Sequence, residues 1–549
     1  MADVTGADVL VRNLKAQGVT HIFGIPGAKV DRVYEALVGS GIELVVCRHE
    51  QNAAFIAAGM GKMTGRAGVC LVTSGPGATN LVTGFATANS EGMPVVGFGG
   101  TVPRGELLKD THQSLDSVTL FRPVTRYSAE IEAPEAIGEV VANAFRAAEG
   151  GRRGAAYVSL PMDVMTGAAP DRVLTPVRPP RLGPGPAEEI AEAAALIAKA
   201  ARPVLLLGMD ASRPQAAAAI RRLLAASPLP TVCTYQGAGV VSRDLLDCFA
   251  GRVGLFHNQP ADQLLDAADL VVTIGYNPIE YDARLWNAGK ARGIVHIDHV
   301  PATIDQDYRP TVEILGDIGG SIDLLAAKLG ARRLDDPLLG AVRREMDDIR
   351  ARGPGLGGVP LHPLRIISEL QPFVTDDVTL ALDIGSFYIW HSRYLYSFRP
   401  EQLLISDGQQ TLGVALPWAI AACLARPRDK VLSVSGDGGF LFSAQELETA
   451  VRLRCNFVHM IWRDGRYDMV AFQQQNKYGR HSGVDFGPVD IVKYAEAFGA
   501  TGFRVDHPDQ FAATLRRAME TPGPVLIDIP VDYAENVKLG QALHRDVIV

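Results

Sequence analysis

The stretch VVCRHEQNAAFIAAGMG, residues 45–61, runs from an apolar strand tip into a carboxylate, Glu50, and then into a helix of small residues. The same change from strand to helix recurs through the first third of the chain. The buried-strand candidates there are HIFGI, IELVVC, AGVCLVTSG, MPVVGFGG and AAYVSLP. Apolar strands that alternate with helices are typical of a doubly wound parallel sheet. Ligands bind beyond the carboxyl ends of strands in such sheets, so Glu50 lies at a candidate site.

The pattern returns twice along the chain. The strand candidates are RPVLLLG, LPTVCTY, LVVTIGY and GIVHIDH in the middle third, and VTLALDIGS, QLLISDG, KVLSVSGDGG, NFVHMIWRDG and PVLIDIP in the last third. Two passages rich in proline and glycine, 166–189 and 351–363, separate the three parts. We therefore predict an α/β protein with three doubly wound parallel-sheet domains, at 1–168, 188–345 and 362–549.

The composition fits a globular protein, with 47% apolar and 21% charged residues among 549. No uninterrupted apolar run reaches the ~18 residues of a membrane span, and residues 1–19 lack the layout of a signal peptide. The six cysteines are scattered without a CxxC pair, which is typical of reduced thiols in a cytoplasmic protein. The formal net charge of -8 argues against nucleic acid or an anionic membrane as partner. We expect a cytoplasmic protein that binds a small molecule.

A glycine-rich turn follows a buried-strand candidate in VSGDGGFLFSAQELETAV. The residues of the turn are Gly436, Asp437, Gly438 and Gly439. Backbone N–H groups at such a turn can cradle a phosphate, which Asp437 would repel unless a cation lay between them. The motif thus indicates a metal-bridged diphosphate, with an ordinary tight turn as the alternative. The next strand candidate ends at Asp464, 464 − 437 = 27 residues further on, so neighbouring strands would deliver two oxygen ligands to one Mg²⁺.

The pairing of RHEQNAA with GDG and an acid 27 residues later resembles the thiamine-diphosphate enzymes of the acetohydroxyacid synthase and pyruvate decarboxylase superfamily. The chain is similar in particular to the catabolic, acetolactate-forming branch, which is independent of FAD. The motifs that carry this likeness are GIPGAKV, SGPGATN, THQSLD, FRPVTRYSAE, NQPADQLL, IGYNPIEYD, QTLGVALPWAI and YDMVAFQQQNKY. The likeness extends from about residue 5 to about residue 540.

The resemblance implies that the first domain binds the aminopyrimidine of thiamine diphosphate, that the last binds its diphosphate, and that the middle domain is structural. Glu50 matches the glutamate that hydrogen-bonds the pyrimidine N1′. A carboxylate there favours the imino tautomer, whose N4′ can remove the proton from the thiazolium C2, so the cofactor acts as its own general base. The alternative is a surface acid that caps the helix from Gln51.

Other residues match the walls of the pyrimidine pocket. Pro76 and Asn80 fall on the lining loop, although loop rigidity alone also favours Gly-Pro-Gly. Gln410 would offer its carbonyl to the 4′-amino group. Leu412 matches the bulky residue that imposes the V shape between the two rings, and a plain core position is the alternative. Met469 is also assigned to cofactor binding.

The metal-binding positions follow from the same likeness. Asp437 and Asp464 match the two metal-ligating side chains, and Arg466 matches the position that donates a backbone carbonyl. Most relatives carry asparagine in place of Asp464, whereas acetolactate-forming members often carry aspartate. The extra negative charge is expected to tighten the site on Mg²⁺.

The resemblance also assigns substrate contacts. Gln113 and Lys29 match residues that line the space above the reactive carbon. Lys29 could pair with a pyruvate carboxylate or orient Gln113, and a solvated lysine is an equal alternative. Gln473 stands where the biosynthetic enzymes place a tryptophan that favours 2-ketobutyrate. The lost apolar contact is worth only ~1–3 kcal/mol per methylene, and we expect pyruvate to be the preferred acceptor.

Three departures from the family pattern modify these expectations. IGYNPIEYD replaces the glycine-arginine-aspartate pattern of flavin-binding relatives, so FAD is not expected. Phe387 stands where relatives commonly have a histidine near the diphosphate, which removes one expected phosphate contact. The chain ends at HRDVIV, shorter than the tail that often folds over the active site, so we expect looser closure or closure by another segment.

The implied reaction begins with decarboxylation of one pyruvate, which leaves a hydroxyethyl group on thiamine diphosphate. This group adds to a second pyruvate and gives 2-acetolactate, a precursor in acetoin biosynthesis. The sequence has no His-His pair, which decarboxylases use to protonate the intermediate, and carboligation is therefore favoured. The alternatives are a related carboligase of secondary metabolism with a different acceptor, a flavin-linked pyruvate oxidase, and a cofactor-binding relative without activity. Because the family builds each site across two subunits, we expect a homodimer or homotetramer.

Overall fold

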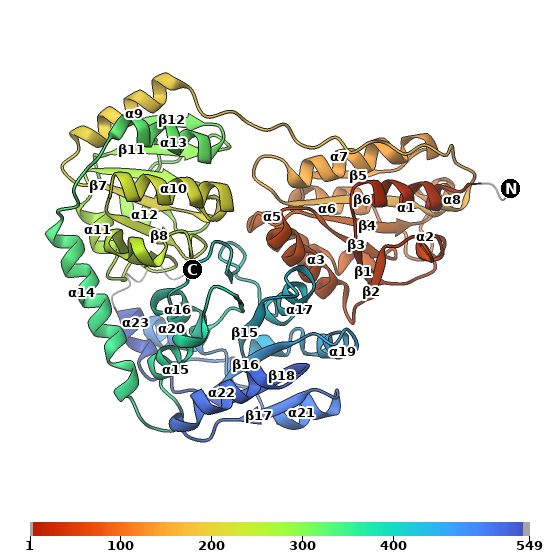
Figure 1. Ribbon diagram of the computed structural model, residues 1–549. Coiled ribbons are helices and arrows are strands. Elements are labelled where there is room, and N and C mark those ends of the chain that lie inside the picture. The colour runs from red at the N-terminus through yellow and green to blue at the C-terminus, as the bar shows by residue number, and fades with distance from the viewer. Residues whose placement is uncertain (1–3, 542–549) are drawn as a thin grey trace. The chain divides into compact units, whose positions relative to one another are not determined.

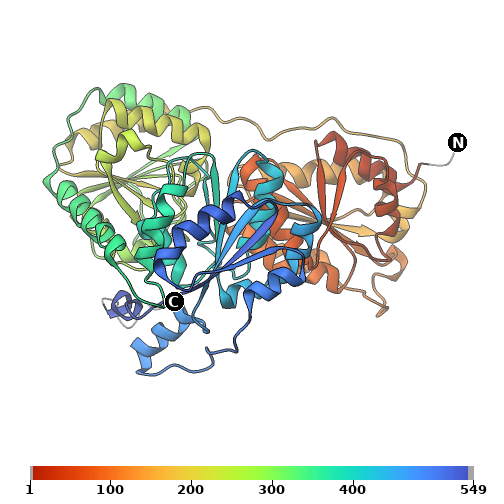
Figure 2. The ribbon, with the colours of Figure 1, turned by 60° about the horizontal axis from the view of Figure 1, so that its bottom comes forward.

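The computed structural model describes residues 4–541 and contains three six-stranded sheets (Figures 1 and 2). The strand pairings within each sheet are parallel, and helices connect successive strands. This arrangement confirms the predicted α/β class with three parallel sheets. The C-terminal stretch HRDVIV, for which we expect looser closure, lies outside the described residues.

The first sheet has the strand order β2-β1-β3-β4-β6-β5. Its strands are β1 (His21–Ile25), β2 (Glu43–Val46), β3 (Gly68–Val72), β4 (Val95–Thr101), β5 (Tyr127–Glu130) and β6 (Ala155–Pro161). The accompanying helices are α1 (Gly6–Ala16), α2 (Asp31–Leu37), α3 (Glu50–Thr64), α4 (Pro76–Thr79), α5 (Val82–Ser90), α6 (Ser117–Phe121), α7 (Ile137–Glu149) and α8 (Met162–Thr166). The strand order reverses between β1 and β3, and the loops that follow these strands therefore border a crevice suited to a ligand.

The second sheet has the order β12-β11-β10-β7-β8-β9, which is the arrangement of dinucleotide-binding folds. Its strands are β7 (Pro203–Leu207), β8 (Thr231–Thr234), β9 (Phe249–Val253), β10 (Leu270–Ile274), β11 (Gly293–Asp298) and β12 (Val312–Leu315). Its helices are α9 (Ala187–Lys199), α10 (Pro214–Ala226), α11 (Asp262–Ala267), α12 (Ala283–Asn287), α13 (Ile318–Leu329) and α14 (Pro337–Ala351). The order reverses between β7 and β10 in this sheet.

The third sheet repeats the order of the first, as β14-β13-β15-β16-β18-β17. Its strands are β13 (Val378–Leu382), β14 (Leu403–Leu404), β15 (Lys430–Gly436), β16 (Phe457–Arg463), β17 (Thr501–Arg504) and β18 (Pro524–Pro530). The helices of this part are α15 (Pro363–Leu370), α16 (Ser386–Tyr394), α17 (Ala415–Ala425), α18 (Asp437–Phe440), α19 (Leu447–Arg452), α20 (Asp468–Tyr478), α21 (Ile491–Ala497), α22 (Phe511–Glu520) and α23 (Asn536–Gln541). The reversal falls between β13 and β15, and β15 ends at the glycine-rich turn.

The chain forms two compact units. The first unit consists of Met1–Pro180, Gly408–Arg428 and Leu441–Asn456, and it contains the first sheet together with α17 and α19. The second unit consists of Arg181–Asp407, Asp429–Phe440 and Phe457–Val549, and it contains the second and third sheets. Within residues 4–541, each helix is too short or too polar to cross a membrane.

Four of the eighteen strands were not predicted from the sequence: β5, β9, β12 and β17. Each of them lies at the edge of its sheet. An edge strand has a neighbour on one side only and often faces solvent, so it lacks the continuous apolar run of a central strand. All four residues of β5 are half-buried, whereas the adjacent β6 is buried along its whole length.

Small residues allow α3 and α17 to pack closely within the first unit (Figure 1). A Cβ atom added at Gly59 of α3 would lie 2.8 Å from Cδ1 of Trp418 and 3.0 Å from Cβ of Ala421, both in α17. A side chain at Gly59 would therefore push the two helices apart.

We predict that Gly59→Ala lowers the thermal unfolding midpoint, because overpacking of a closed helix contact costs about 1–3 kcal/mol. The matched control is Gly340→Ala in α14, where the added Cβ would meet only the flexible end of Arg344, at 3.5 Å. That change is expected to raise the midpoint, because alanine is favoured over glycine in a helix by up to ~1 kcal/mol. Equal effects of the two substitutions in differential scanning calorimetry would contradict this account of the helix contact.

Candidate active site

Glu50 is buried at the start of α3 in the first unit. Its side chain is 8% exposed, and its Oε2 accepts a hydrogen bond of 2.9 Å from Nδ2 of Asn80. The N-cap of α3 is His49, whose Nδ1 accepts from the backbone N–H of Gln51 at 3.1 Å. The capping role that we considered for Glu50 is therefore performed by its neighbour. The carboxylate of Glu50 instead faces the loop that follows β3.

That loop packs tightly against the carboxylate. Gly75 has a φ of 58°, in the left-handed region that glycine adopts without strain, and Pro76 then begins the short α4. A Cβ atom on Gly77 would lie 2.9 Å from Cγ2 of Thr73 and 3.6 Å from Oε1 of Glu50. The Gly-Pro-Gly sequence thus gives the backbone close access to Glu50, and Asn80 at the end of α4 supplies the hydrogen bond.

Gln113 lies against the same loop in a strained backbone conformation. Its φ is 61°, which is rare for a residue with a side chain, and its Oε1 accepts from Oγ of Ser74 at 3.0 Å. A Cβ atom on Gly75 would lie 3.0 Å from Cβ of Gln113. Strain of this kind is often found at functional sites, where surrounding contacts hold it in place. Gln113 thus packs on the loop that contains Pro76 and Asn80, and this loop contacts Glu50 through Asn80.

Lys29 follows β1, on the other side of the strand reversal. The residue is half-buried, and a Cβ atom on Gly100 of β4 would lie 2.9 Å from Cβ of Lys29. This contact fixes the backbone of Lys29 and leaves both interpretations of its ammonium group open.

Gln410 and Leu412 also belong to the first unit. Gln410 has a φ of 48°, a second strained glutamine among the predicted site residues. Leu412 is half-buried, unlike the fully buried core positions of α17 that follow it. Oγ1 of Thr411 lies 2.7 Å from Oγ1 of Thr87 in α5, which ties this segment to the first sheet's helices.

The glycine-rich turn lies in the second unit, where β15 meets α18. Asp437 is 7% exposed; its Oδ1 accepts from the N–H of Gly438 at 3.1 Å, and its Oδ2 accepts from the N–H of Gly465 at 2.9 Å. A Cβ atom on Gly438 would lie 2.5 Å from the ring of Tyr467, and one on Gly439 would lie 3.2 Å from Cγ of Asp383. These positions require glycine, and Gly436 pairs with Trp462 where β15 and β16 run side by side.

Asp464 follows β16 and lies in a group of three carboxylates. Burial is the main reason that the pKa of Asp464 is raised to about 8, and the nearby carboxylates of Asp468 and Asp437 contribute to the same rise. Burial also raises the pKa of Asp437 and of Asp468. Arg466 is a weak counter-charge, because its Nε lies 4.0 Å from Oδ2 of Asp464.

These residues fit a divalent cation. Within residues 4–541, no three His, Cys, Asp or Glu side chains are grouped to form a metal site by themselves. The predicted set has only two side chains, Asp437 and Asp464, with the carbonyl of Arg466. Arg466 forms an isolated antiparallel β-bridge with Asp485. The backbone hydrogen bonds of this bridge are made by Gly465 and Tyr467 on either side of Arg466. The carbonyl of Arg466 therefore points away from the segment that contains Asp485. Mg²⁺ prefers such oxygen ligands and takes the rest from phosphate and water.

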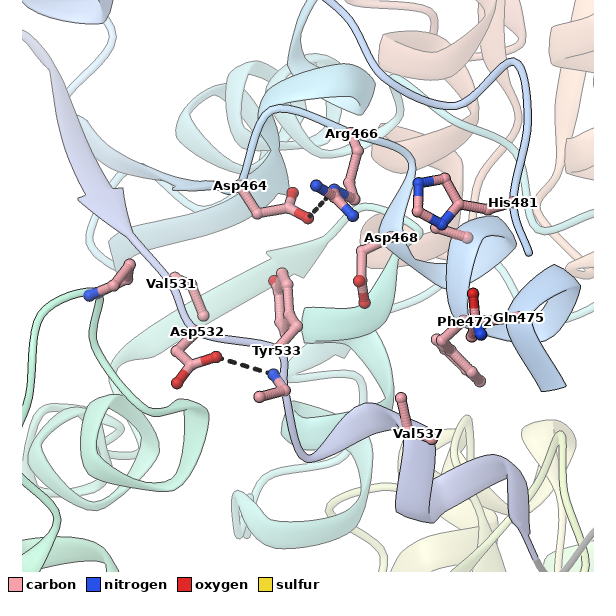
Figure 3. Close-up of a pocket in the computed structure, with 13 residues that line it drawn as sticks. Asp464, Arg466, Asp468, Phe472, Gln475, His481, Val531, Asp532, Tyr533 and Val537 are labelled. Atoms are coloured by element: carbon pink, nitrogen blue, oxygen red, sulfur yellow. Dashed lines mark hydrogen bonds and ion pairs between the residues drawn. The ribbon is translucent and has the colours of Figure 1, made fainter. Parts of the chain in front are cut away.

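A cavity of about 370 Å³ opens beside Asp464 (Figure 3). Its lining includes Asp468, Phe472 and Gln475 of α20, and Tyr533 after β18. Met469 and Gln473 lie on the same helix and are half-buried, but they do not line this cavity. The structure thus does not bring these two predicted residues to the wall beside Asp464.

Asp468 is a residue of this region that the sequence analysis missed. Its Oδ2 accepts from Oγ of Ser386 at 2.5 Å and from Nδ2 of Asn536 at 2.6 Å. These contacts join α16, α20 and α23 next to the metal-ligand positions. The signal available in the sequence was a further acid, Asp468, four residues after Asp464.

Phe387 covers part of the glycine-rich turn. Cε1 of its ring would lie 2.7 Å from a Cβ atom on Gly385 and 3.4 Å from one on Gly436. An aromatic ring thus fills the place beside the turn. The next histidine in the helix, His391, is fully buried, and burial lowers its pKa to about 4, which keeps it neutral.

Comparisons with known proteins agree with this arrangement. Residues 4–120 match the thiamine pyrophosphate enzyme N-terminal TPP binding domain, 190–326 match the central domain, and 383–529 match the C-terminal TPP binding domain. The chain belongs to the thiamine-diphosphate enzyme family, in its acetolactate synthase branch.

Relatives cover nearly the whole chain. Acetolactate synthase of Bacillus subtilis (strain 168) is 53% identical over 537 residues, which cover 97% of this chain and 94% of the relative. The catabolic acetolactate synthase of Raoultella terrigena is 51% identical over 548 residues, with 99% and 98% covered. The large subunit of acetolactate synthase isozyme 2 of Escherichia coli (strain K12) is 32% identical over 545 residues, with 97% of each chain covered.

We predict that Asp464→Asn raises the unfolding midpoint of the cofactor-free protein, because it removes one of three crowded carboxylates. The gain should grow as the pH rises from about 5 to about 8. In the folded parent Asp464 has a pKa of about 8, whereas in the unfolded chain it ionises near ~3.9. Over this range the unfolded parent therefore binds fewer protons than the folded parent, and the parent loses stability as the pH rises. Asparagine does not ionise, so the variant does not lose this stability.

The matched control is Asp485→Asn, in the segment that follows α20; its side chain is 60% exposed and pairs with Arg466. Because Asp464 is retained, the midpoint of this variant should differ from that of the parent by nearly the same small amount at every pH in this range. Calorimetric titration with Mg²⁺ and thiamine diphosphate should show weaker binding by Asp464→Asn. A stability gain that shrinks with rising pH would contradict the proposed crowding of carboxylates.

Proposed function

We propose that the protein condenses two pyruvate molecules to 2-acetolactate and carbon dioxide with thiamine diphosphate as cofactor. The observation that carries the proposal is the buried carboxylate of Glu50, held by Asn80 at the crevice of the N-terminal domain. The acetolactate synthase relatives support the reaction, and the position of Glu50 supports a role in activating the cofactor. When bound, the cofactor supplies a positively charged thiazolium ring that accepts the electron pair released as carbon dioxide leaves pyruvate.

The first unit would hold the aminopyrimidine. Glu50 would share a proton with the ring nitrogen N1′, and Asn80 would keep the Glu50 carboxylate oriented toward it. The carbonyl of Gln410 would accept from the 4′-amino group, and Leu412 would support the bent conformation. Gln113 would face the substrate. Pro76 would keep the lining loop rigid.

The second unit would hold Mg²⁺ and the diphosphate. Asp437, Asp464 and the carbonyl of Arg466 are the proposed metal ligands. Gly436, Gly438 and Gly439 are the proposed diphosphate contacts, through backbone N–H groups of the glycine-rich turn. We keep Met469 as a proposed cofactor contact and Gln473 and Lys29 as proposed substrate contacts.

We propose that the enzyme does not need FAD. The crevice of the second sheet, between β7 and β10, is where a dinucleotide would bind in this strand order. The carboxylate of Glu280, which is 3% exposed, fills that position. It accepts from the N–H of Met209 at 2.7 Å and 3.0 Å and from Oγ1 of Thr234 at 3.1 Å. The carboxyl group of Glu280 thus accepts from the backbone N–H that follows β7, where a nucleotide phosphate would otherwise accept a hydrogen bond.

We also propose a cytoplasmic homodimer or homotetramer of three-domain chains, with domains at 1–168, 188–345 and 362–549. Each active site would combine Glu50 of one subunit with Asp437 of another, by analogy with the family. Because the product would be 2-acetolactate, the enzyme would serve acetoin biosynthesis.

The first test supplies pyruvate, Mg²⁺ and thiamine diphosphate without FAD. We predict that 2-acetolactate is the main product and that Glu50→Gln lowers kcat by roughly 10²-fold or more, the usual contribution of a positioned proton-transfer group. The matched control is Glu43→Gln, an acid in β2 whose side chain is 59% exposed, which should keep parental activity. Product identity is measured by mass spectrometry.

Other outcomes of this assay separate the alternatives. No acetolactate from pyruvate alone would favour a carboligase with another acceptor, and dependence on added FAD would favour the flavin-linked oxidase. A Glu50→Gln protein as active as the parent would contradict the role of Glu50.

The second test asks whether the site spans two subunits. Glu50→Gln and Asp437→Asn are each expected to be inactive alone. Co-expression of the two variants should restore about a quarter of the parental activity, because half of randomly paired dimers would have one intact site of two. Isolated heterodimers without activity would show that both residues must come from the same chain.

A further inference from the structure

Two buried glutamates in the first unit contact the backbone next to the predicted pyrimidine-binding residues, and neither was a predicted site residue. Glu446 lies in the 3₁₀ turn Ala444–Glu446 before α19, and Glu91 follows α5. Both side chains are 0% exposed. Buried carboxylates are costly unless hydrogen-bonded, so their partners indicate what the chain gains by retaining them.

Glu446 is bound to both sides of Glu50 along the chain. The backbone N–H of Arg48 donates to Oε1 and Oε2 of Glu446 at 3.1 Å and 3.2 Å, and Nδ2 of Asn52 donates to Oε2 at 2.9 Å. Oγ1 of Thr449 donates to Oε1 at 2.7 Å. The turn from β2 into α3 is therefore fixed two residues before Glu50 and two residues after it.

Both carboxylate oxygens of Glu446 accept hydrogen bonds in these contacts. The partners Arg48, Asn52 and Thr449 all donate, so a glutamine at position 446 would turn its amide toward at least one donor. Burial raises the pKa of Glu446, while hydrogen bonds from Thr449, Asn52 and Arg48 act in the opposite direction. Glutamate at position 446 therefore accepts from all of these donors, which glutamine could not do.

Glu91 acts on the other pyrimidine-facing segment. Its Oε1 accepts from the backbone N–H of Gly408 at 2.9 Å and of Gln409 at 3.2 Å. The next residue is Gln410, whose φ of 48° is strained. Such a conformation persists only where surrounding contacts determine it, and the two hydrogen bonds from Glu91 supply contacts of that kind.

We propose that Glu446 and Glu91 are positioning residues, which set the carboxylate of Glu50 and the carbonyl of Gln410 respectively. The inference rests on the proposed function, because it assigns the two segments to the aminopyrimidine. The contacts are reciprocal within the unit. Glu446 comes from the C-terminal part of the chain and holds an N-terminal turn, whereas Glu91 comes from the N-terminal part and holds a C-terminal turn. Each turn is thereby fixed before any cofactor binds.

The first experiment measures amide hydrogen–deuterium exchange in the cofactor-free protein. Glu446→Gln should speed exchange at least tenfold in residues 47–53 and leave 407–412 unchanged. Glu91→Gln should do the reverse, so each variant is the control for the other. Glu35→Gln, in α2 and with a side chain that is 73% exposed, should change neither segment. Unchanged exchange in both segments, or equal acceleration in both, would overturn the proposal.

The second experiment measures kinetics in the parental and Glu50→Gln backgrounds. Glu446→Gln should lower kcat at least tenfold, with the KM for pyruvate within threefold of the parent, and Glu446→Asp should restore part of the loss. In the Glu50→Gln background it should cause less than a twofold further loss, because it acts through Glu50. The same fold loss in both backgrounds would indicate general damage and overturn the proposal. Full activity of Glu50→Gln alone would contradict the role of Glu50, whereas a parental enzyme that makes no 2-acetolactate from pyruvate would refute the proposed function, whatever the exchange data show.

Discussion

The hydrogen bond from Asn80 to the buried carboxylate of Glu50 joins the loops that follow β3 and β2, and the proposed pyrimidine site depends on it. The loops meet there because β2, β1 and β3 are consecutive parallel neighbours that end at the same edge. Glycines at 75 and 77 allow the backbone to approach the carboxylate. The strained φ of Gln113 is then held against Gly75. The unfavourable backbone conformation of Gln113 is thus retained against the loop that contacts Glu50.

The second unit has a different constraint, which is electrostatic. Asp437, Asp464 and Asp468 lie close enough to raise the pKa of Asp464, and Arg466 compensates only from 4.0 Å. Such an arrangement is unfavourable in the protein alone and becomes favourable around a divalent cation. In the proposed metal site, the glycine-rich turn, the strand register of β15 with β16 and the acids after both strands would serve that one requirement. Stability without the metal is therefore lower than it would be with a neutral residue at position 464.

Local patterns in the sequence predict the parts of the structure that depend on local chemistry. Central strands such as β4 and β6 are mostly apolar and buried along their whole length, and Asp437 and Asp464 directly follow central strands. Edge strands such as β5 lack this signal. Glu446 and Glu91 could not be predicted, because their partners lie 398 and 317 positions away in the chain. The left-handed conformation of Gln410 has no signal either, since residues other than glycine rarely adopt it.

The central claim is that Glu50 and the two acids of the third sheet bind opposite ends of one thiamine diphosphate. A crystal structure of the protein with thiamine diphosphate and Mg²⁺ tests it most directly. We predict an Oε of Glu50 within about 2.5–3.0 Å of the pyrimidine N1′. We also predict Mg²⁺ at about 2.1 Å from carboxylate oxygens of Asp437 and Asp464. A pyrimidine ring whose N1′ faces solvent, or a metal bound without these two acids, would contradict the account.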